Sequence, residues 1–208
     1  MSEAVPGRVR QARGDLTRKR IVDSATNLIY EKGYAATTVD DVIRQADATK
    51  GSFYHHFSSK EELGRAVIDN ASSYIAQRIG KVLDRERSSP LRRIEIILGE
   101  IQRIVESAGC ERGCIIGNLA LEMSQRYEEF RAGVAEVFKS WSSSIASQLD
   151  EMKAAGLLSA DFDGNAYADF AIAAVEGGIM MSKLTRDPSP MRNSISFVLE
   201  TLRNLSDR

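Results

Sequence analysis

The sequence is poor in cysteine and in long apolar runs. Cys110 and Cys114 are the only cysteines among 208 residues; two are too few for a disulfide scaffold and suit a reducing cytoplasm. No apolar run approaches the roughly 20 residues that a membrane helix needs, and the polar N-terminus lacks the apolar core of a signal peptide. We therefore expect a cytoplasmic protein that does not enter a membrane.

Motifs of common catalytic and cofactor sites are also missing. The sequence has no GxGxxG, Walker, GxSxG or HExxH pattern. Its two cysteines, four residues apart, and the adjacent His55 and His56 do not have the spacing of zinc ligands. The sequence thus predicts a protein that is not an enzyme and that holds no cofactor and no metal.

Charge is nearly balanced overall but uneven along the chain. The net charge is −1, yet the first 20 residues carry six Lys and Arg against two acidic residues. A basic N-terminal segment is a pointer to a phosphate-bearing partner, although a solvated, disordered tail has the same composition. We predict a flexible basic arm over residues 1–14.

Apolar residues recur at helical spacing almost everywhere, and no stretch has the pattern of a strand. The first apolar stripe, from Ile21 to Ile29, is followed by Gly33, a common helix stop. Thr38, with Asp41 three residues further on, predicts a capping box at the start of a second helix. We therefore predict an all-α protein, with about six longer helices after three short ones.

The second and third helices, joined by a three-residue turn, form a predicted helix-turn-helix over residues 15–62, with the first helix packed across both. In this motif the second helix of the pair lies in the major groove of DNA. Phe53 and Phe57 are four residues apart, so they face inward and anchor that helix. Side chains on its other faces, and hydroxyl and amino groups at the neighbouring helix starts, can reach bases and phosphates. The predicted DNA-binding residues are Thr38, Lys50, Gly51, Ser52, Tyr54, His56 and Lys60.

The stretch TTVDDVIRQADATKGSFYHHFSSKEEL resembles the DNA-binding signature of the TetR family of transcriptional regulators, over about residues 17–63. The resemblance implies a homodimeric repressor that binds double-stranded operator DNA of near-palindromic sequence. It also implies that residues 63–208 form a helical ligand-binding and dimerisation domain, with the helix of residues 60–80 as the lever between domains. Arg8, Arg10 and Arg13 would then reach the minor groove or add salt-dependent affinity.

The chain departs from the family pattern at the turn. The family usually has Gly near Asp47, whereas this chain reads Ala46-Asp47-Ala48. We expect the turn to survive because a short polar residue tolerates its backbone conformation.

Two apolar helices near the end, 165–184 and 191–206, are more hydrophobic than the surface of a monomer requires. They are predicted to form a four-helix dimer interface, although ordinary core helices would have the same composition. The predicted interface residues are Phe170, Gly177, Met181, Ile195, Val198, Leu199 and Leu202. Aromatic residues and methionine could line an apolar effector pocket, with plain core as the alternative; these are Met123, Tyr127, Phe138, Trp141 and Phe170.

Cys114 is predicted at a helix N-terminus, which would lower the pKa of its thiol, with Arg112 adding to the effect. The segment RGCIIGNLALE is similar to one in a TetR subgroup that controls reductases for reactive electrophiles, where the matching cysteine is the sensing thiol. Lys183 matches a lysine of that subgroup, and Cys110 is a possible resolving thiol.

Two other interpretations stay open. Both cysteines could be buried apolar residues, in a regulator whose effector is an unreactive hydrophobic molecule. The helix-turn-helix could also bind protein and not DNA; only DNA binding should weaken steeply with salt.

Overall fold

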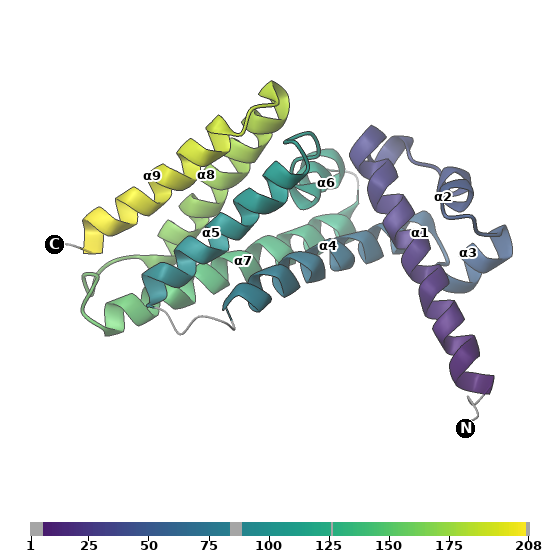
Figure 1. Ribbon diagram of the computed structural model, residues 1–208, viewed down its shortest axis with the longest axis horizontal. Coiled ribbons are helices and arrows are strands. Elements are labelled where there is room, and N and C mark those ends of the chain that lie inside the picture. The colour runs from purple at the N-terminus through teal and green to yellow at the C-terminus, as the bar shows by residue number, and fades with distance from the viewer. Residues whose placement is uncertain (1–5, 84–88, 126, 207–208) are drawn as a thin grey trace.

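The computed structural model describes residues 6–83, 89–125 and 127–206, with side chains from residue 14 onwards. These ranges form nine helices and no strand (Figure 1), which confirms the all-α prediction. The helices are α1 (Pro6–Ala36), α2 (Val39–Gln45), α3 (Lys50–His56), α4 (Lys60–Leu83), α5 (Pro90–Ser107), α6 (Ile115–Met123), α7 (Glu128–Ala154), α8 (Gly164–Thr185) and α9 (Ser189–Ser206). Within the described ranges, no helix has both the length and the apolar character needed to cross a membrane.

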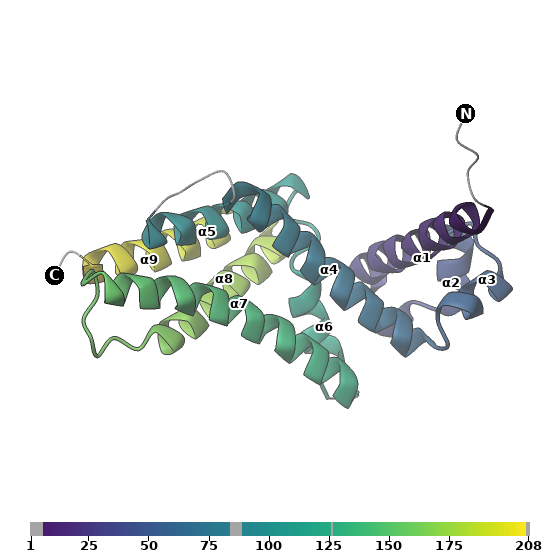
Figure 2. The same cartoon turned by 90° about the horizontal axis from the view of Figure 1, so that it is seen from below.

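Helices α1 to α3 form a small unit at one end of the molecule, and α4 runs from this unit into the larger bundle (Figure 2). Local sequence sets its helix boundaries. Gly33 has φ 81° and interrupts α1. Thr38 caps α2 in a capping box with Asp41, as predicted, and Thr49 caps α3 by accepting the Ser52 amide.

The turn between α2 and α3 survives without glycine. Asp47 has φ 47°, in the left-handed region where Gly or a short polar residue is favoured. The amide of Ala48 donates to the carbonyl of Ile43 at 3.0 Å and closes the turn.

The predicted arm needs correction. Helix α1 begins at Pro6, so most of residues 1–14 continues the first helix. Pro at the first helical position is well tolerated because its missing amide has no partner there. The side chains of Arg8, Arg10 and Arg13 lie outside the described part of the chain.

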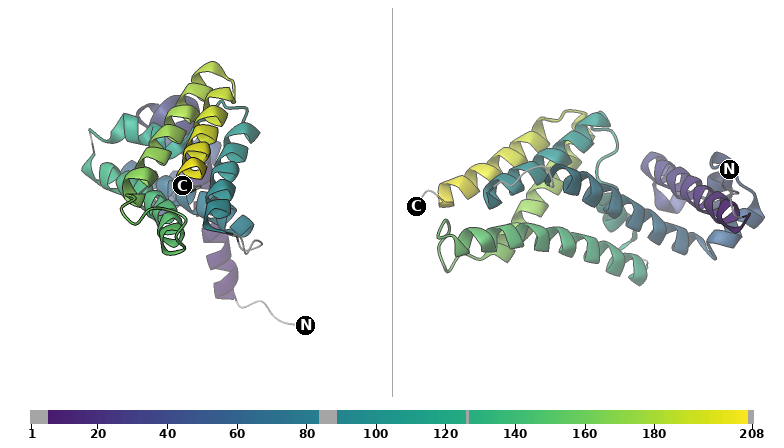
Figure 3. Two further views of the ribbon diagram at one scale, coloured as in Figure 1. Left: turned by 90° about the vertical axis from the view of Figure 1, so that its left-hand side faces the viewer. Right: turned by 60° about the horizontal axis from the view of Figure 1, so that its bottom comes forward.

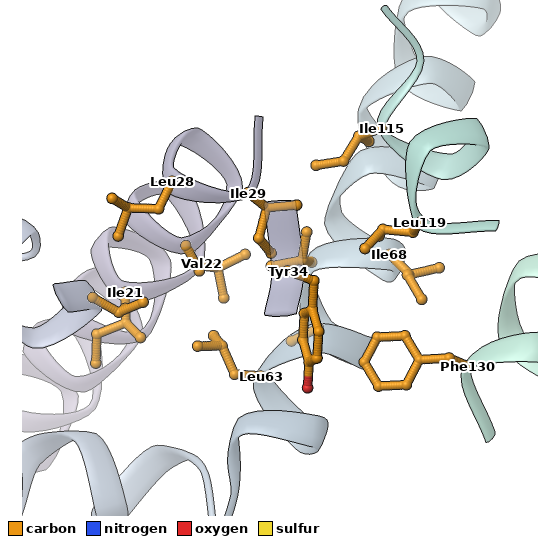
Figure 4. Close-up of a cluster of buried hydrophobic side chains, with 14 of the residues drawn as sticks. Ile21, Val22, Leu28, Ile29, Tyr34, Leu63, Ile68, Ile115, Leu119 and Phe130 are labelled. Carbon is orange, nitrogen blue, oxygen red and sulfur yellow. The ribbon is translucent and has the colours of Figure 1, made fainter. Parts of the chain in front are cut away.

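Helices α5, α7, α8 and α9 form the larger bundle (Figure 3), in which α8 and α9 pair most extensively. The two units share one hydrophobic core, to which α1, α4, α6 and α7 all contribute (Figure 4). In it the ring of Tyr34 packs edge-on against Phe130, with 4.9 Å between ring centroids. A Cβ on Gly64 would lie 2.8 Å from the Tyr34 ring, so this junction requires glycine. The helix-turn-helix is therefore held against the bundle by close packing.

Candidate nucleic-acid interface and effector cavity

Helix α3 is anchored as the sequence predicts. Phe53 and Phe57 are fully buried under α1, while Lys50, Gly51 and Tyr54 are exposed. Tyr54 keeps 51% of its surface accessible. Ser52 is half-buried, and its amide donates to the hydroxyl of the Thr49 cap. One face of α3 is thus left available to a partner.

His56 departs from the predicted outward orientation. Its imidazole lies against α1, where a Cβ on Gly14 would be 3.8 Å from the ring. Burial lowers the pKa of His56, and the nearby His55 and Arg18 lower it further. His55, which the prediction omitted, is exposed instead. The sequence held the signal, because position 55 lies midway between the two inward anchors and therefore opposite them on a helix.

Lys60 and Thr38 lie at the junction of α1, α2 and α4. The ammonium of Lys60 is 4.3 Å from the centroid of the Tyr34 ring and donates to the carbonyl of Ala35 at 3.3 Å. Burial lowers the pKa of Lys60. Thr38 is exposed at the start of α2. Lys60 therefore braces the two units in addition to lying near the predicted DNA face.

A cavity of about 400 Å³ lies between α1, α4, α5, α7 and α8, against the N-terminus of α6. Its walls are mostly apolar, a feature typical of small-molecule sites. Its lining includes Tyr30, Tyr74, Ile97, Ile101, Ile172 and Glu176, none of which the sequence singled out. Six helices and a connecting segment supply the lining, so no local pattern marks it.

Of the five predicted pocket residues, only Trp141 lines the cavity. Met123 is buried in the shared core, and Phe138 packs there beside Trp141. Tyr127 contacts Tyr34 outside the cavity, and Phe170 is exposed. The other four predictions fail because an aromatic or methionine stripe does not distinguish core from cavity wall.

Cys114 caps α6 and lies at the polar end of the cavity. Its sulfur accepts the Gly117 amide at 3.5 Å, and the carboxyl of Glu176 lies beside its thiol. Burial raises the pKa of Cys114, and the negative charge of Glu176 raises it further. The predicted lowering by the helix N-terminus is therefore wrong. Arg112 does not offset it, because its guanidinium stacks on Tyr30 and bonds to Asn27.

The other two residues of the thiol hypothesis lie nearby but are otherwise engaged. Cys110 is buried in the core of the larger bundle, and burial raises its pKa. Lys183 extends over Gly113 and its ammonium lies 3.4 Å from the amide oxygen of Asn118. Both cysteines are free thiols.

The predicted dimer interface also needs correction. Ile195, Val198 and Leu202 are buried between α9 and the rest of the same chain, and Leu199 is partly buried there. The exposed large apolar residues of α8 and α9 are Phe170, Met180, Met181, Leu184 and Phe197, which we call the outer apolar face. Helices α8 and α9 themselves lie at the outer edge of the bundle (Figure 1). Both helices are amphipathic or nearly apolar, so composition did not show which residues face inward.

The adjacent Gly177 and Gly178 of α8 also differ in what they contact. A Cβ on Gly178 would be 2.9 Å from the Met191 Cα, so Gly178 permits the close crossing of α8 and α9 within the chain. Gly177 has no such neighbour within 4 Å. Only Gly177 is therefore free to take part in a contact outside the chain.

A three-helix unit with an exposed recognition helix, packed on a helical bundle that encloses a cavity, defines a DNA-binding regulator. Residues 21–67 match the family of bacterial regulatory proteins called the tetR family, and residues 90–198 match the tetracyclin repressor-like C-terminal domain. The chain belongs to the TetR family of DNA-binding transcriptional regulators and is not an enzyme.

Related proteins align over nearly the whole chain. The transcriptional regulator AcuR of Cereibacter sphaeroides is 31% identical, covering 91% of this chain and 90% of its own. The HTH-type transcriptional repressor DhaR of Mycobacterium sp. strain GP1 is 29% identical, covering 89% and 91%. The crystal structure of a TetR regulatory protein from Rhodobacter sphaeroides is 30% identical, with a TM-score of 0.81, and covers 89% of this chain and 98% of that chain.

Proposed function

We propose that the protein is a cytoplasmic, homodimeric repressor that leaves a near-palindromic operator when a small, mostly apolar molecule fills the cavity. The observation that carries this proposal is the cavity's position: its wall includes the first residues of α6, and the far end of α6 holds the helix-turn-helix. Proteins of this family bind operator DNA as dimers, and the relative DhaR is named a repressor.

Residues 15–62 would bind DNA and residues 63–208 would sense the effector and dimerise. The two recognition helices of a dimer must lie about 34–36 Å apart to enter successive major grooves. Lys50, Tyr54 and His55 are the exposed groups of α3 that can reach bases or phosphates. Gly51 and Ser52 lie on the same helix and Thr38 at the start of α2, whereas His56 packs against α1 and Lys60 braces the junction with α4.

Replacing Lys50 with alanine is expected to weaken operator binding by about tenfold, because one base or phosphate contact is lost. The slope of log affinity against log salt should fall by about one if that contact is to a phosphate. Lys139→Ala removes an equally exposed lysine of α7 and should change neither. Fluorescence anisotropy at several salt concentrations measures both quantities, and equal affinities for the two variants would remove Lys50 from the interface.

Helix α6 would couple the cavity to DNA. The carboxylate of Glu122, near its end, accepts the amides of Tyr34 at 2.9 Å and Ala35 at 2.7 Å. These amides lie four and three residues, respectively, before the Thr38 cap of α2. Cys114 and Ile115, at the start of α6, line the cavity. A molecule that displaces the start of α6 would therefore tilt the helix-turn-helix, with α4 as the second connection.

The outer apolar face of α8 and α9 would form the dimer interface. Phe170, Gly177, Met181 and Leu184 recur at intervals of seven, four and three residues, so they lie along one stripe of α8. Phe197 adds an exposed aromatic ring from α9. Exposed apolar patches of this kind mark protein interfaces, and a two-fold contact would place the same patch of each subunit together.

Trp141, the only tryptophan of the sequence, lines the cavity and can report its occupancy. The test is to titrate small apolar molecules into the complex of the protein with DNA from upstream of its gene. We expect molecules that change Trp141 fluorescence to release the DNA over the same concentration range. Release by molecules that leave Trp141 emission unchanged would place the effector site elsewhere.

A reactive Cys114, helped by Lys183 or Cys110, is the second candidate for the effector response. The resemblance of its segment to that of electrophile-responsive regulators supports it. The environment opposes it, since burial and Glu176 favour the protonated thiol over the reactive thiolate.

Both thiols of the folded protein are expected to react slowly with Ellman's reagent at pH 8, by at least about tenfold relative to the unfolded chain, because burial raises both pKa values and limits access. Absorbance at pH 8, with and without guanidinium, measures this. Rapid reaction of one thiol in the folded protein, lost in Cys114→Ser, would instead support the thiol sensor.

A further inference from the structure

The cavity contains one acidic side chain that lacks a cationic partner. Glu176 lies on α8 and lines the cavity, and its carboxyl lies beside the Cys114 thiol. No ion pair within the described ranges includes Glu176. The first turn of α6 makes room for it, because a Cβ on Gly117 would lie 2.6 Å from its Oε2 atom. Glu176 thus supplies the carboxyl, and Gly117 leaves the space that this carboxyl occupies.

A second buried acid of the same chain has the cationic partners that Glu176 lacks. Glu100 is 2% exposed, and its carboxylate is paired with Arg78 and Arg103 at 2.5 Å. A buried carboxylate without such pairing is costly, which is why most are neutralised by a cation or by a proton. Burial accordingly raises the pKa of Glu176. A ligand that brings a positive charge would remove this cost.

The rest of the cavity suits an apolar body attached to such a charge. Ile97, Ile101 and Ile172 provide aliphatic walls. Tyr30, Tyr74 and Trp141 add aromatic rings, whose faces attract cations. The nearby Arg112 is an exposed rim residue already stacked on Tyr30 and bonded to Asn27. Glu176 is therefore the only acid, and Arg112 the only Lys or Arg, among the described residues that line the cavity.

We propose that the effector is an organic ammonium: an apolar molecule whose protonated amine binds the Glu176 carboxylate while its hydrocarbon part lies among the isoleucine and aromatic side chains. This inference rests on the proposed function and names the chemical class of its effector. A carboxylate effector would meet Glu176 as a like charge. A neutral alcohol would leave the carboxylate without a counter-charge.

Three probes of one shape separate these classes: 4-phenylbutylamine, 4-phenylbutan-1-ol and 4-phenylbutanoate. Calorimetric titration of the full-length protein at pH 7 gives the affinity of each. We expect the amine to bind at least about tenfold tighter than the alcohol, since hydrogen bonds between charged groups contribute more than hydrogen bonds between neutral ones. Glu176→Gln should remove this preference but keep the affinity for the alcohol, which shows that the cavity is intact.

Two further variants sharpen the test. Gly117→Ala retains the charge but pushes the carboxyl from its place, and should also reduce the preference for the amine. Glu136→Gln removes an exposed acid of α7 and should leave the preference unchanged. The inference is overturned if the alcohol or the carboxylate binds as tightly as the amine, if the amine does not bind, or if Glu176→Gln retains the preference.

Operator release, measured with the same probes, separates this inference from the proposed function. Glu176-dependent amine binding that leaves the DNA complex intact supports the inference and contradicts the proposed function. Equal release by all three probes supports the proposed function and overturns the inference.

Discussion

Replacing Phe197 and Leu184 with glutamate is expected to yield a folded monomer that binds the operator at least about 100-fold more weakly. These side chains are 67% and 80% exposed in the single chain, so the substitutions disturb no core. In the proposed dimer they would bury unpaired charges at the centre of the interface. A monomer also loses the gain of about 10²–10⁴ that comes from joining two binding modules.

Sedimentation and fluorescence anisotropy test this expectation together. Leu16→Glu provides the matched control, since Leu16 is similarly exposed but lies on α1, far from α8 and α9 (Figure 1). This control should remain a dimer. A dimeric double variant with unchanged DNA affinity would show that the outer apolar face is not the interface.

Removing the Glu122 carboxylate should lower both the stability of the fold and the affinity for the operator. Glu122→Ala leaves the Tyr34 and Ala35 amides without their acceptor, which should lower the free energy of unfolding by about 2 kcal/mol. The helix-turn-helix would then be held less firmly, so we expect operator affinity to fall by about tenfold. Effector binding should persist, because Glu122 lies outside the cavity lining, but its power to release DNA should decrease.

Denaturant unfolding, anisotropy and Trp141 fluorescence measure these three effects. Glu122→Gln retains a neutral acceptor and should give intermediate values, while Glu136→Ala is a control for loss of one acid elsewhere. If Glu122→Ala loses stability but keeps full effector-driven release, the coupling runs through α4 and not through α6.

The helix-turn-helix was predictable because local chemistry determines it. The Thr38 and Asp41 capping box, the turn at Asp47 and the anchors Phe53 and Phe57 all act within a few residues. His55 and His56 show the limit of this reasoning, because which histidine faces outward depends on where α1 lies.

The all-α class, the helix boundaries near their caps and the DNA-binding family follow from the sequence, because these depend on short-range spacing. The cavity lining, the side of α9 that faces outward and the state of the Cys114 thiol follow from how the helices pack together. Each of these depends on residues from helices distant in sequence. Burial, together with Glu176, 62 positions after Cys114, outweighs the lowering that the helix N-terminus alone would give the pKa of that thiol, and no spacing along the chain records that these groups meet.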